Sequence, residues 1–248
     1  MQNVMLKYLN RGVSQSALSL FRNCPYAFQL RYINKCKPVF YDESVLDVGG
    51  YVHDSIDGYY KHHYELVQDS ETILYYSYQL LKNQWDTLLK PEQFQQAYEC
   101  LFNHSNWEYG QQQKGVITQP LTEQELSYGG YFGIIDYIDL LKNNVIDWKT
   151  GKNAYLSYEY RMQAYIYKVI YEGNFNKKLD KFLFYFLFPN EFRMVSYNKE
   201  KQIKVAEETE KLKRDLYDAV ESMNFEKKPR TPKGCRSCSF VYYCHGNK

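Results

Sequence analysis

Long apolar runs are missing from this sequence of 248 residues. No stretch of about 18 apolar residues is present, so the sequence predicts no membrane-spanning helix. The first residues, MQNVMLKYLNRG, also lack the apolar core of a secretory signal peptide. We therefore expect an intracellular protein in the cytoplasm, or in the host cytoplasm if the gene is viral.

A strong net charge is missing too, and so is a nucleotide-binding loop. The 31 Lys and Arg residues are nearly balanced by 29 Asp and Glu residues, giving a net charge of +2. No overall basic field indicates a polyanionic partner, although a local basic groove is still allowed. The segment Thr150-Gly151-Lys152-Asn153 lacks the preceding Gly and the following Ser or Thr of a phosphate-binding loop. We therefore expect no ATP-driven motor in this chain.

Hydrophobic periodicity predicts an α/β fold with a mixed central sheet flanked by helices, in a single domain of residues 1–248. The expected helices are Ser14–Tyr32, Val48–Tyr64, two within 70–113 divided at Pro91, Tyr155–Glu172 and Lys199–Met223. The expected strands are Thr118–Tyr128, a hairpin within Gly133–Lys152, Phe182–Phe188 and Arg193–Tyr197. The block 70–113 carries no recognisable chemistry, and we interpret it as a helical insertion.

The hairpin GIIDYIDLLKNNVIDWKTGK carries unusual charge for an apolar ribbon. If Asn143-Asn144 forms a two-residue turn, the numbers of paired residues add up to 287, and Asp136, Asp147 and Lys149 share one face. A three-residue loop would break this parity. The other interpretation is a half-exposed hairpin whose charges are solvated.

Two acids and a lysine on one face suit metal-dependent hydrolysis of phosphodiesters. Carboxylate oxygens bind Mg²⁺ or Mn²⁺, and the metal polarises the phosphoryl oxygen and lowers the pKa of a bound water. A lysine stabilises charge that develops on the phosphate or orients the attacking water. His53 follows the pair Gly49-Gly50 on a predicted helix. A lone helical histidine is usually structural, but paired glycines allow close backbone approach to another group.

Cysteines gather near the C-terminus, where Cys235, Cys238 and Cys244 form a C-x₂-C-x₅-C pattern. Three thiolates need a fourth ligand, and Cys24 is the best candidate because it also lies beside a proline. The weaker alternatives are His245, Cys36 and Cys100. Four thiolates suit either structural Zn²⁺ or an iron–sulfur cluster, and the spacing does not choose between them. Either group would join the two ends of the chain like a staple, with the segment 229–248 packed against the region of Cys24.

Several segments together resemble a known family. The pieces, in chain order, are SQSALSLFRNCPYAF, GGYVH, GIIDYID, VIDWKTGK, QAYIY and CRSCSFVYYC. In this order they resemble the RecB-type branch of the PD-(D/E)xK nuclease superfamily, and within it the iron–sulfur exonucleases typified by the CRISPR-associated exonuclease Cas-four and the AddB nuclease domain. The first acid follows an isoleucine rather than a proline, a departure common in this branch.

The resemblance implies a role for individual residues. The implied metal ligands are His53, Asp136, Asp147 and the backbone carbonyl of Trp148, and the implied catalytic group comprises Lys149, Asp136, Asp147, Gln163 and Tyr167. Gln163 and Tyr167 match the Q-x-x-x-Y motif, which supports the site and contacts DNA. The resemblance also implies that Cys24, Cys235, Cys238 and Cys244 hold a 4Fe–4S cluster, and this favours the cluster over Zn²⁺.

The implied activity is that of a deoxyribonuclease dependent on Mn²⁺ or Mg²⁺, an exonuclease that prefers single-stranded DNA or frayed ends. The implied settings are CRISPR adaptation and antiviral defence, DNA repair or recombination, and viral genome processing, with a CRISPR integrase or recombination proteins as partners. The alternatives are a non-catalytic or partner-activated subunit that binds DNA ends, and a structure-specific endonuclease.

Overall fold

The computed structural model describes residues 10–38, 44–64, 69–85, 90–114, 119–179, 181–236 and 238–245. The helices are α2 (Gln15–Asn23), α3 (Pro25–Phe28), the π-helix η1 (Gln29–Ile33), α4 (Ser44–His62), α5 (Ser70–Gln84), α6 (Pro91–Gln112), α7 (Tyr158–Phe175), α8 (Glu200–Ser222), the 3₁₀-helix η3 (Pro232–Cys235) and α9 (Val241–His245). The strands are β1 (Leu121–Tyr128), β2 (Tyr131–Asp139), β3 (Asn144–Lys149), β4 (Lys181–Phe186) and β5 (Glu191–Val195). No helix in these ranges is long and apolar enough to cross a membrane.

One mixed sheet of five strands forms the centre of the fold, in the order β1-β2-β3-β4-β5. Three neighbouring pairs are antiparallel, and β3 and β4 are parallel. A parallel pair needs a long crossover connection, and α7 provides it. The predicted mixed α/β sheet flanked by helices is therefore confirmed.

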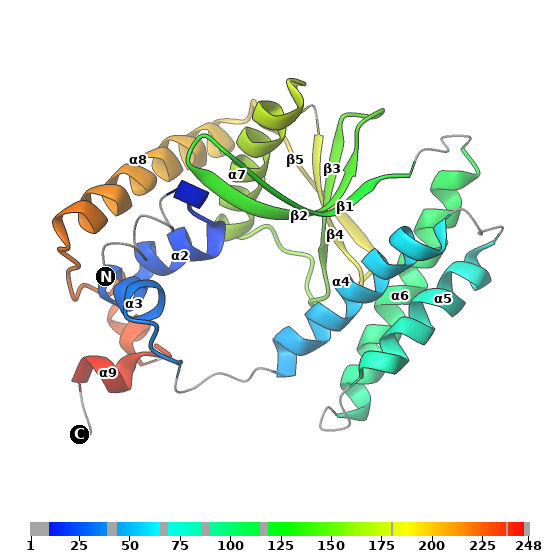
Figure 1. The fold of residues 1–248 in the computed structure, drawn as a ribbon, viewed down its shortest axis with the longest axis horizontal. Helices are drawn as coiled ribbons and strands as arrows, with labels where there is room; N and C mark the ends of the chain where they lie inside the picture. Colours follow the sequence, from blue (N-terminus) through cyan, green and yellow to red (C-terminus); the bar gives the residue numbers. More distant parts are fainter. Residues whose placement is uncertain are drawn as a thin grey trace.

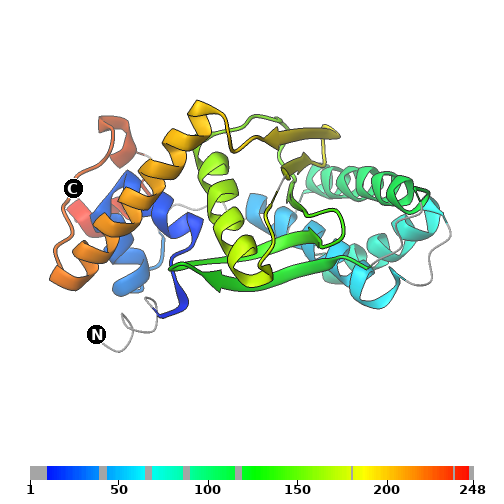
Figure 2. The ribbon, with the colours of Figure 1, turned by 90° about the horizontal axis from the view of Figure 1, so that it is seen from above.

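Helices cover both faces of the sheet, and each face has its own apolar core (Figure 1). Helices α2, α7 and α8 pack on one face, in a core that includes Val145 and Phe182. Helices α4, α5 and α6 pack on the other face, in a core that includes Trp148 and Tyr185. Side chains alternate along a strand, so adjacent residues of β3 enter different cores. Figure 2 shows the same arrangement from above, with α4 to α6 at one end and α2, α3 and α9 at the other.

The register of the central hairpin differs from the predicted one. The loop comprises residues 140–143 rather than Asn143-Asn144, and Tyr137 pairs with Ile146, so paired numbers add up to 283 instead of 287. The prediction was wrong because the turn is longer. Its first residues are held by the carboxylate of Asp139, which accepts two backbone N–H groups at 3.0 Å. The shift is an even number of residues, so the predicted faces of the strands are unchanged.

Three helix starts show where local sequence signals mark the beginning of a helix and where they do not. Ser14 caps α2 by accepting the N–H of Ala17 at 3.3 Å. Pro25 restarts the helix as α3, as expected of a residue that suits a first helical turn. In contrast, α4 begins at Ser44, so the pair Gly49-Gly50 lies inside the helix rather than at its predicted start.

Gly133 lies where α7 packs against β2, and it provides a test of this packing. A Cβ atom there would lie 2.5 Å from Cε1 of Tyr167, whose hydroxyl donates to the carbonyl of Ile134 at 2.6 Å. We expect Gly133→Ala to lower the free energy of unfolding by about 2 kcal/mol in urea denaturation, because the buried ring must move. Gly110→Ala is the control, since nothing lies within 4 Å of its added Cβ and alanine favours a helix by roughly 1 kcal/mol. Equal destabilisation of both variants would contradict this packing.

Candidate functional site

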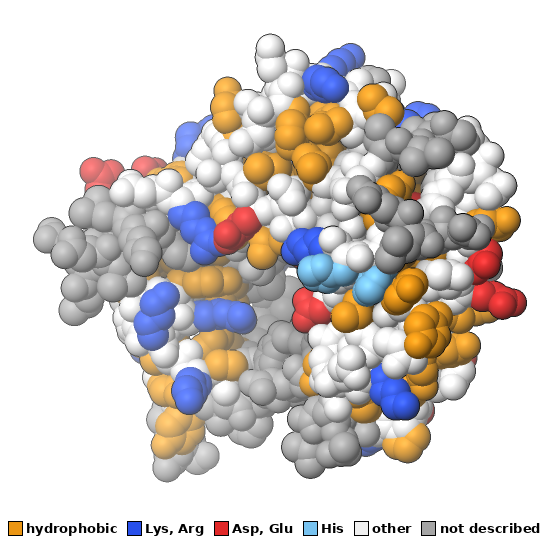
Figure 3. Space-filling model, turned by 45° about the vertical axis from the view of Figure 1, so that its right-hand side comes forward, with side chains coloured by type: hydrophobic (Ala, Val, Ile, Leu, Met, Phe, Trp, Pro, Cys, Tyr) orange, Lys and Arg blue, Asp and Glu red, His pale blue; other side chains and the backbone are white. Residues whose placement is uncertain are grey.

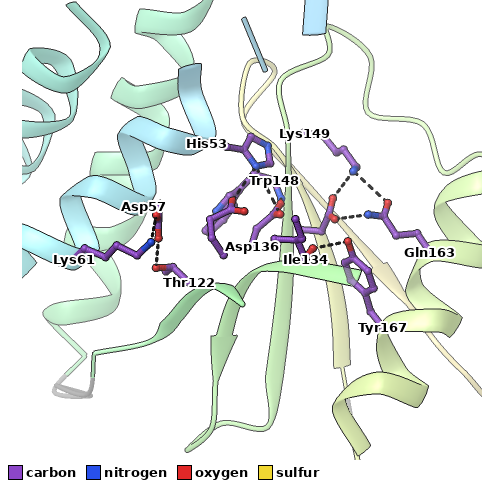
Figure 4. Close-up of polar contacts among 12 residues, drawn as sticks. His53, Asp57, Lys61, Thr122, Ile134, Asp136, Trp148, Lys149, Gln163 and Tyr167 are labelled. Carbon is purple, nitrogen blue, oxygen red and sulfur yellow. Dashed lines mark hydrogen bonds and ion pairs between the residues drawn. The ribbon is translucent and has the colours of Figure 1, made fainter. Parts of the chain in front are cut away.

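The candidate residues lie where β2 separates from β3 (Figure 4). The last pair between these strands is Tyr137 and Ile146, beyond which β2 continues beside β1 and β3 beside β4. Asp136 and Asp147 are the next residues on each strand, so both carboxylates lie at this fork on one face of the sheet. Oδ2 of Asp136 accepts the backbone N–H of Trp148 at 2.7 Å. The separation of the two strands therefore holds the carboxylate of Asp136 beside that of Asp147.

Lys149 and Gln163 form a polar group around Asp147. Nζ of Lys149 lies 2.5 Å from Oδ2 of Asp147 and donates to Oε1 of Gln163 at 3.2 Å. Nε2 of Gln163 donates to Oδ1 of Asp147 at 2.7 Å. Tyr167 lies one turn further along α7, and its bond to the carbonyl of Ile134 fixes that helix on β2. Both oxygens of Asp147 are thus held, and its side chain is only 2% exposed.

His53 reaches the fork from α4 and meets a second acid there. Its Nδ1 atom lies 3.3 Å from Oε1 of Glu123 and 3.6 Å from Oδ1 of Asp136. Ligand atoms of these three residues lie within 4.8 Å of one another, in the one such group of His, Cys, Asp or Glu found among the described residues. A histidine and two carboxylates are a suitable donor set for Mn²⁺ and, less specifically, Mg²⁺. The side chains of His53 and Glu123 are 26% and 24% exposed, so the group is reachable from solvent.

Three acidic side chains are crowded at the fork beside His53 and Lys149. Burial raises the pKa of Asp136, and although His53 opposes this, Asp147 and Glu123 help to bring it to about 8. Burial lowers the pKa of His53, but Asp136 and Glu123 raise it to about 9. Burial also lowers the pKa of Lys149, and Asp147 and Asp136 raise it above its ordinary value. The raised pKa of Asp136 reflects this crowding of acids, and a divalent cation bound there would offset the repulsion between their carboxylates.

Glu123 is the residue that sequence reasoning missed. Its φ angle is +45°, a left-handed conformation that costs on the order of 1–3 kcal/mol for a residue other than glycine and is concentrated at functional sites. The register of β1 with β2 places it opposite Asp136, between two regular pairs. A signal was present in the sequence. A two-residue turn at Gly129-Gly130, counted back along both strands, aligns Glu123 with Asp136.

The strand that carries Glu123 is fastened to α4 near His53. Oγ1 of Thr122 donates to Oδ1 of Asp57 at 2.6 Å, and the ammonium of Lys61 lies 2.6 Å from the other oxygen of Asp57. Asp57 follows His53 by one helical turn. This contact therefore fixes the spacing between the helix and the strand that supply two of the three grouped side chains (Figure 4).

We expect Glu123→Gln to weaken Mn²⁺ binding by about tenfold or more, because the amide keeps the shape of the side chain but removes its charge. Isothermal titration of the purified protein with MnCl₂ measures this effect. Glu125→Gln is the matched control on the same strand, since Glu125 is exposed and pairs with Arg11 instead. An unchanged Mn²⁺ affinity in Glu123→Gln would remove this residue from the candidate metal site.

Four of the six cysteines line one pocket. Cys24 follows α2, and Cys235, Cys238 and Cys244 come from the C-terminal segment. Burial raises the pKa of the Cys244 thiol, and despite the opposing effect of Lys227 the other three cysteines raise it further. The pocket therefore brings together side chains from distant parts of the sequence.

The remaining candidate ligands lie elsewhere or outside the described part. Cys100 is fully buried in the core of α4 to α6. Cys36 packs near Cys24 and Cys238 but does not line their pocket. The side chain of His245 is outside the described residues. Among those described, no group of three ligand atoms within 4.8 Å includes a cysteine sulfur.

Comparison with known proteins gives one informative result. A family model described as the PD-(D/E)XK nuclease superfamily matches residues 12–245, a range that includes every residue of the fork and the four cysteines of the pocket. No curated protein matches the sequence. A solved structure titled "Crystal structure of SSO0001" is 13% identical, with a TM-score of 0.40 over 100% of this chain and 96% of that chain, a likeness too weak to carry an argument. On the family match, this chain belongs to the PD-(D/E)XK nuclease superfamily.

Proposed function

We propose that this chain is a DNA exonuclease that hydrolyses phosphodiester bonds with Mn²⁺ or Mg²⁺. The observation that carries the proposal is the fork between β2 and β3, where Asp136, Asp147 and Lys149 meet His53 and Glu123. Three strands, and a helix from the opposite face of the sheet, supply these groups, so the fold itself builds the arrangement. Membership of a nuclease superfamily supports phosphodiester chemistry at this place.

The side chains at the fork have separate tasks in this proposal. The metal ligands are His53, Glu123, Asp136 and Asp147, with the backbone carbonyl of Trp148 as a further candidate. A bound Mn²⁺ or Mg²⁺ supplies Lewis acidity toward the phosphate. The ligands themselves would hold that cation at the mouth of the fork.

Lys149 is the cation that acts on the reacting phosphate or on the attacking water. Gln163 keeps Lys149 and Asp147 in fixed relation, because it accepts from one and donates to the other. Tyr167 holds α7 against β2 and so keeps Gln163 in place. Gln163 and Tyr167 are thus positioning residues here, and a DNA contact by either is a further expectation from the motif.

The preferred substrate in this proposal is single-stranded DNA or a frayed end, and the biological setting is CRISPR adaptation, DNA repair or recombination, or viral genome processing. The resemblance of the ordered motifs to RecB-type exonucleases supports this choice. In such a setting the chain works in the cytoplasm beside a CRISPR integrase or recombination proteins. A neighbouring integrase gene would favour the first of the three.

We further propose that the chain is one nuclease domain over residues 1–248, with 70–113 as an insertion and a 4Fe–4S cluster that joins the segment 229–248 to the region of Cys24. The shared pocket of the four cysteines supports this. A single Zn²⁺ would need thiolates about 3.8 Å apart, because each lies roughly 2.3 Å from the metal. Among the described residues, no three cysteine sulfurs lie within 4.8 Å of one another. A cluster accepts wider spacing, because each thiolate binds a different iron atom, so structural Zn²⁺ is the less favoured alternative.

Degradation of single-stranded DNA tests the proposed function. Separate substrates carry a label at the 5′ end or the 3′ end, and each is incubated with Mn²⁺, Mg²⁺ or EDTA. Asp147→Ala is prepared and assayed beside the wild-type protein. We expect metal-dependent release of label by the wild type alone, and the label released first gives the polarity.

Covalently closed circular DNA separates the alternatives. Cleavage of the circle would replace the exonuclease with an endonuclease. Tight binding of DNA ends without metal-dependent cleavage, in protein prepared without oxygen, would replace it with a partner-activated or non-catalytic subunit. An exonuclease leaves the circle intact while it degrades the linear strand.

A further inference from the structure

Charge is distributed unevenly between the two ends of the molecule. We call residues 10–38 and 223–245, which contain α2, α3, η3 and α9, the cysteine lobe. This lobe has ten Lys and Arg residues and a single acid, Glu226. We call residues 44–114, which contain α4 to α6, the helical block, and it has four Lys residues against ten Asp and Glu. The small net charge of the whole chain therefore conceals a basic end and an acidic end.

Most of the cations of the cysteine lobe are exposed and lack a carboxylate partner among the described residues. They are Arg31, Lys35, Lys37, Lys227, Lys228, Arg230 and Arg236. Like charges held together on one surface raise its electrostatic potential and attract a polyanion. Such a surface attracts phosphate groups.

Three of these basic side chains, together with the partly buried Arg22, are gathered around the cysteine pocket and its border with the sheet. We call Arg22, Arg31, Lys227 and Arg230 the basic cluster. Arg31 and Arg230 line the pocket, and Lys227 lies 4.6 Å from the ring of Tyr26, which also lines it. The N–H of Arg230 donates to the carbonyl of Asn23 at 2.8 Å, which brings Arg230 beside Arg22. Figure 3 shows Lys and Arg side chains gathered on the left of the hollow in that face of the molecule.

The basic cluster is close to the fork through α7. The guanidinium of Arg22 lies 3.5 Å from the ring centre of Tyr158 and 3.5 Å from Oε1 of Glu159, both at the start of α7. Gln163, which contacts Asp147 and Lys149, follows Tyr158 by about 7.5 Å along the helix axis. A strand bound at the fork would therefore reach Arg22 within a few nucleotides.

We propose that the basic cluster binds the phosphate backbone of single-stranded DNA and directs the strand to the fork. The helical block does not contact the DNA in this proposal. This inference rests on the proposed nuclease function, and it assigns the route of the substrate. Phosphate contacts from Lys and Arg are independent of sequence and sensitive to salt. The cysteine lobe is then the DNA-holding part of the enzyme as well as a structural joint.

Salt dependence of DNA binding tests this route. The full-length protein binds a fluorescent oligothymidylate in EDTA, and anisotropy is measured over a range of KCl concentrations. The test variant carries Arg31→Gln, Lys227→Gln and Arg230→Gln, all at exposed positions. The matched control carries Lys82→Gln, Lys90→Gln and Lys114→Gln, exposed lysines of the helical block. Both variants lose three positive charges, so only the location differs.

We expect the test variant to bind about tenfold to a hundredfold more weakly, with a slope of log affinity against log salt that is smaller by about 2, since each phosphate contact on a single strand contributes roughly 0.7. The control should match the wild type. Equal slopes for both variants, or equal losses in both, would overturn the proposal. Binding of the wild type to phosphatidylserine vesicles that oligothymidylate fails to displace would assign the cluster to a membrane surface and also overturn it.

A small phosphodiester separates this proposal from the proposed function. Metal-dependent hydrolysis of bis(p-nitrophenyl) phosphate needs the fork but no long strand. We expect both triple variants to hydrolyse it at the wild-type rate. If the wild type itself fails to hydrolyse it while the binding results hold, the nuclease function fails and the DNA-binding surface stands.

Discussion

Lys149→Ala is expected to lower the rate of metal-dependent DNA cleavage by about 10²- to 10³-fold, the effect of removing one preorganised group that stabilises transition-state charge. The ammonium group lies 2.5 Å from Oδ2 of Asp147, and the amide oxygen of Gln163 holds it at 3.2 Å. It is therefore fixed at the place where charge on the phosphate would develop. Single-turnover cleavage of labelled single-stranded DNA at saturating Mn²⁺ measures the chemical step.

The same variant should bind Mn²⁺ more tightly than the wild type. Removal of a positive charge beside Asp147 leaves the fork more negative, so a divalent cation is attracted more strongly. The metal-free variant should also unfold more easily by a few kcal/mol, because a buried carboxylate has lost its partner, and Mn²⁺ should restore much of that loss. Titration calorimetry and thermal unfolding with and without Mn²⁺ measure both effects.

Lys152→Ala is the matched control for this prediction. Lys152 is an exposed lysine only three residues further along the chain, and its ammonium lies 5.9 Å from the ring of Phe188 rather than at the fork. Its replacement should leave cleavage and metal affinity unchanged. Cleavage retained by Lys149→Ala would remove Lys149 from the chemistry. Cleavage lost together with Mn²⁺ binding would reduce its role to maintaining the shape of the site.

The sequence predicted the faces of the central hairpin better than its register. Asp136, Asp147 and Lys149 share a face as expected, because a shift from 287 to 283 preserves parity. The physical reason for the wrong register is the carboxylate of Asp139. It stabilises a longer turn by accepting two N–H groups, and Asn143-Asn144 alone suggested a shorter one. The correct register places Asp136 and Asp147 closer together than predicted.

Tertiary contacts, rather than local sequence patterns, determine which side chains meet at the candidate site. The Q-x-x-x-Y motif indicated Gln163 and Tyr167. Only the packing of α7 on β2 shows that Gln163 contacts Asp147 and that Tyr167 contacts the carbonyl of Ile134. The turn at Gly129-Gly130 aligns Glu123 with Asp136, but nothing in the local pattern of β1 marks Glu123 as a member of the site. Its role depends on His53, seventy residues earlier in the chain, and on a strand fork that no local periodicity specifies.

Cys238→Ala is expected to remove the proposed iron–sulfur cluster and to lower the melting temperature by about 10 °C, as for a loss of roughly 3–4 kcal/mol in a protein of this size. Cys238 lies between Cys235 and the buried Phe240, and it borders the pocket shared with Cys24. The side chains lining that pocket come from both ends of the chain. Loss of the bound group would leave the two ends joined by a small apolar core and a few backbone hydrogen bonds. Iron, acid-labile sulfide, zinc and visible absorbance are measured in protein purified without oxygen.

Cys36→Ala is the matched control for this prediction. Cys36 packs in the same lobe near Cys238 but does not line the pocket, so its variant should keep the iron and the stability of the wild type. Zinc without iron in the wild type would replace the cluster with a structural Zn²⁺ site, even if Cys238→Ala loses that metal. If the wild type contains neither iron nor zinc, and Cys238→Ala is as stable as Cys36→Ala, no metal group links the two ends of the chain. In that outcome the small apolar core of Ala27, Leu30 and Phe240, together with the backbone hydrogen bonds between the two segments, suffices to hold the C-terminal segment against α3 and η1.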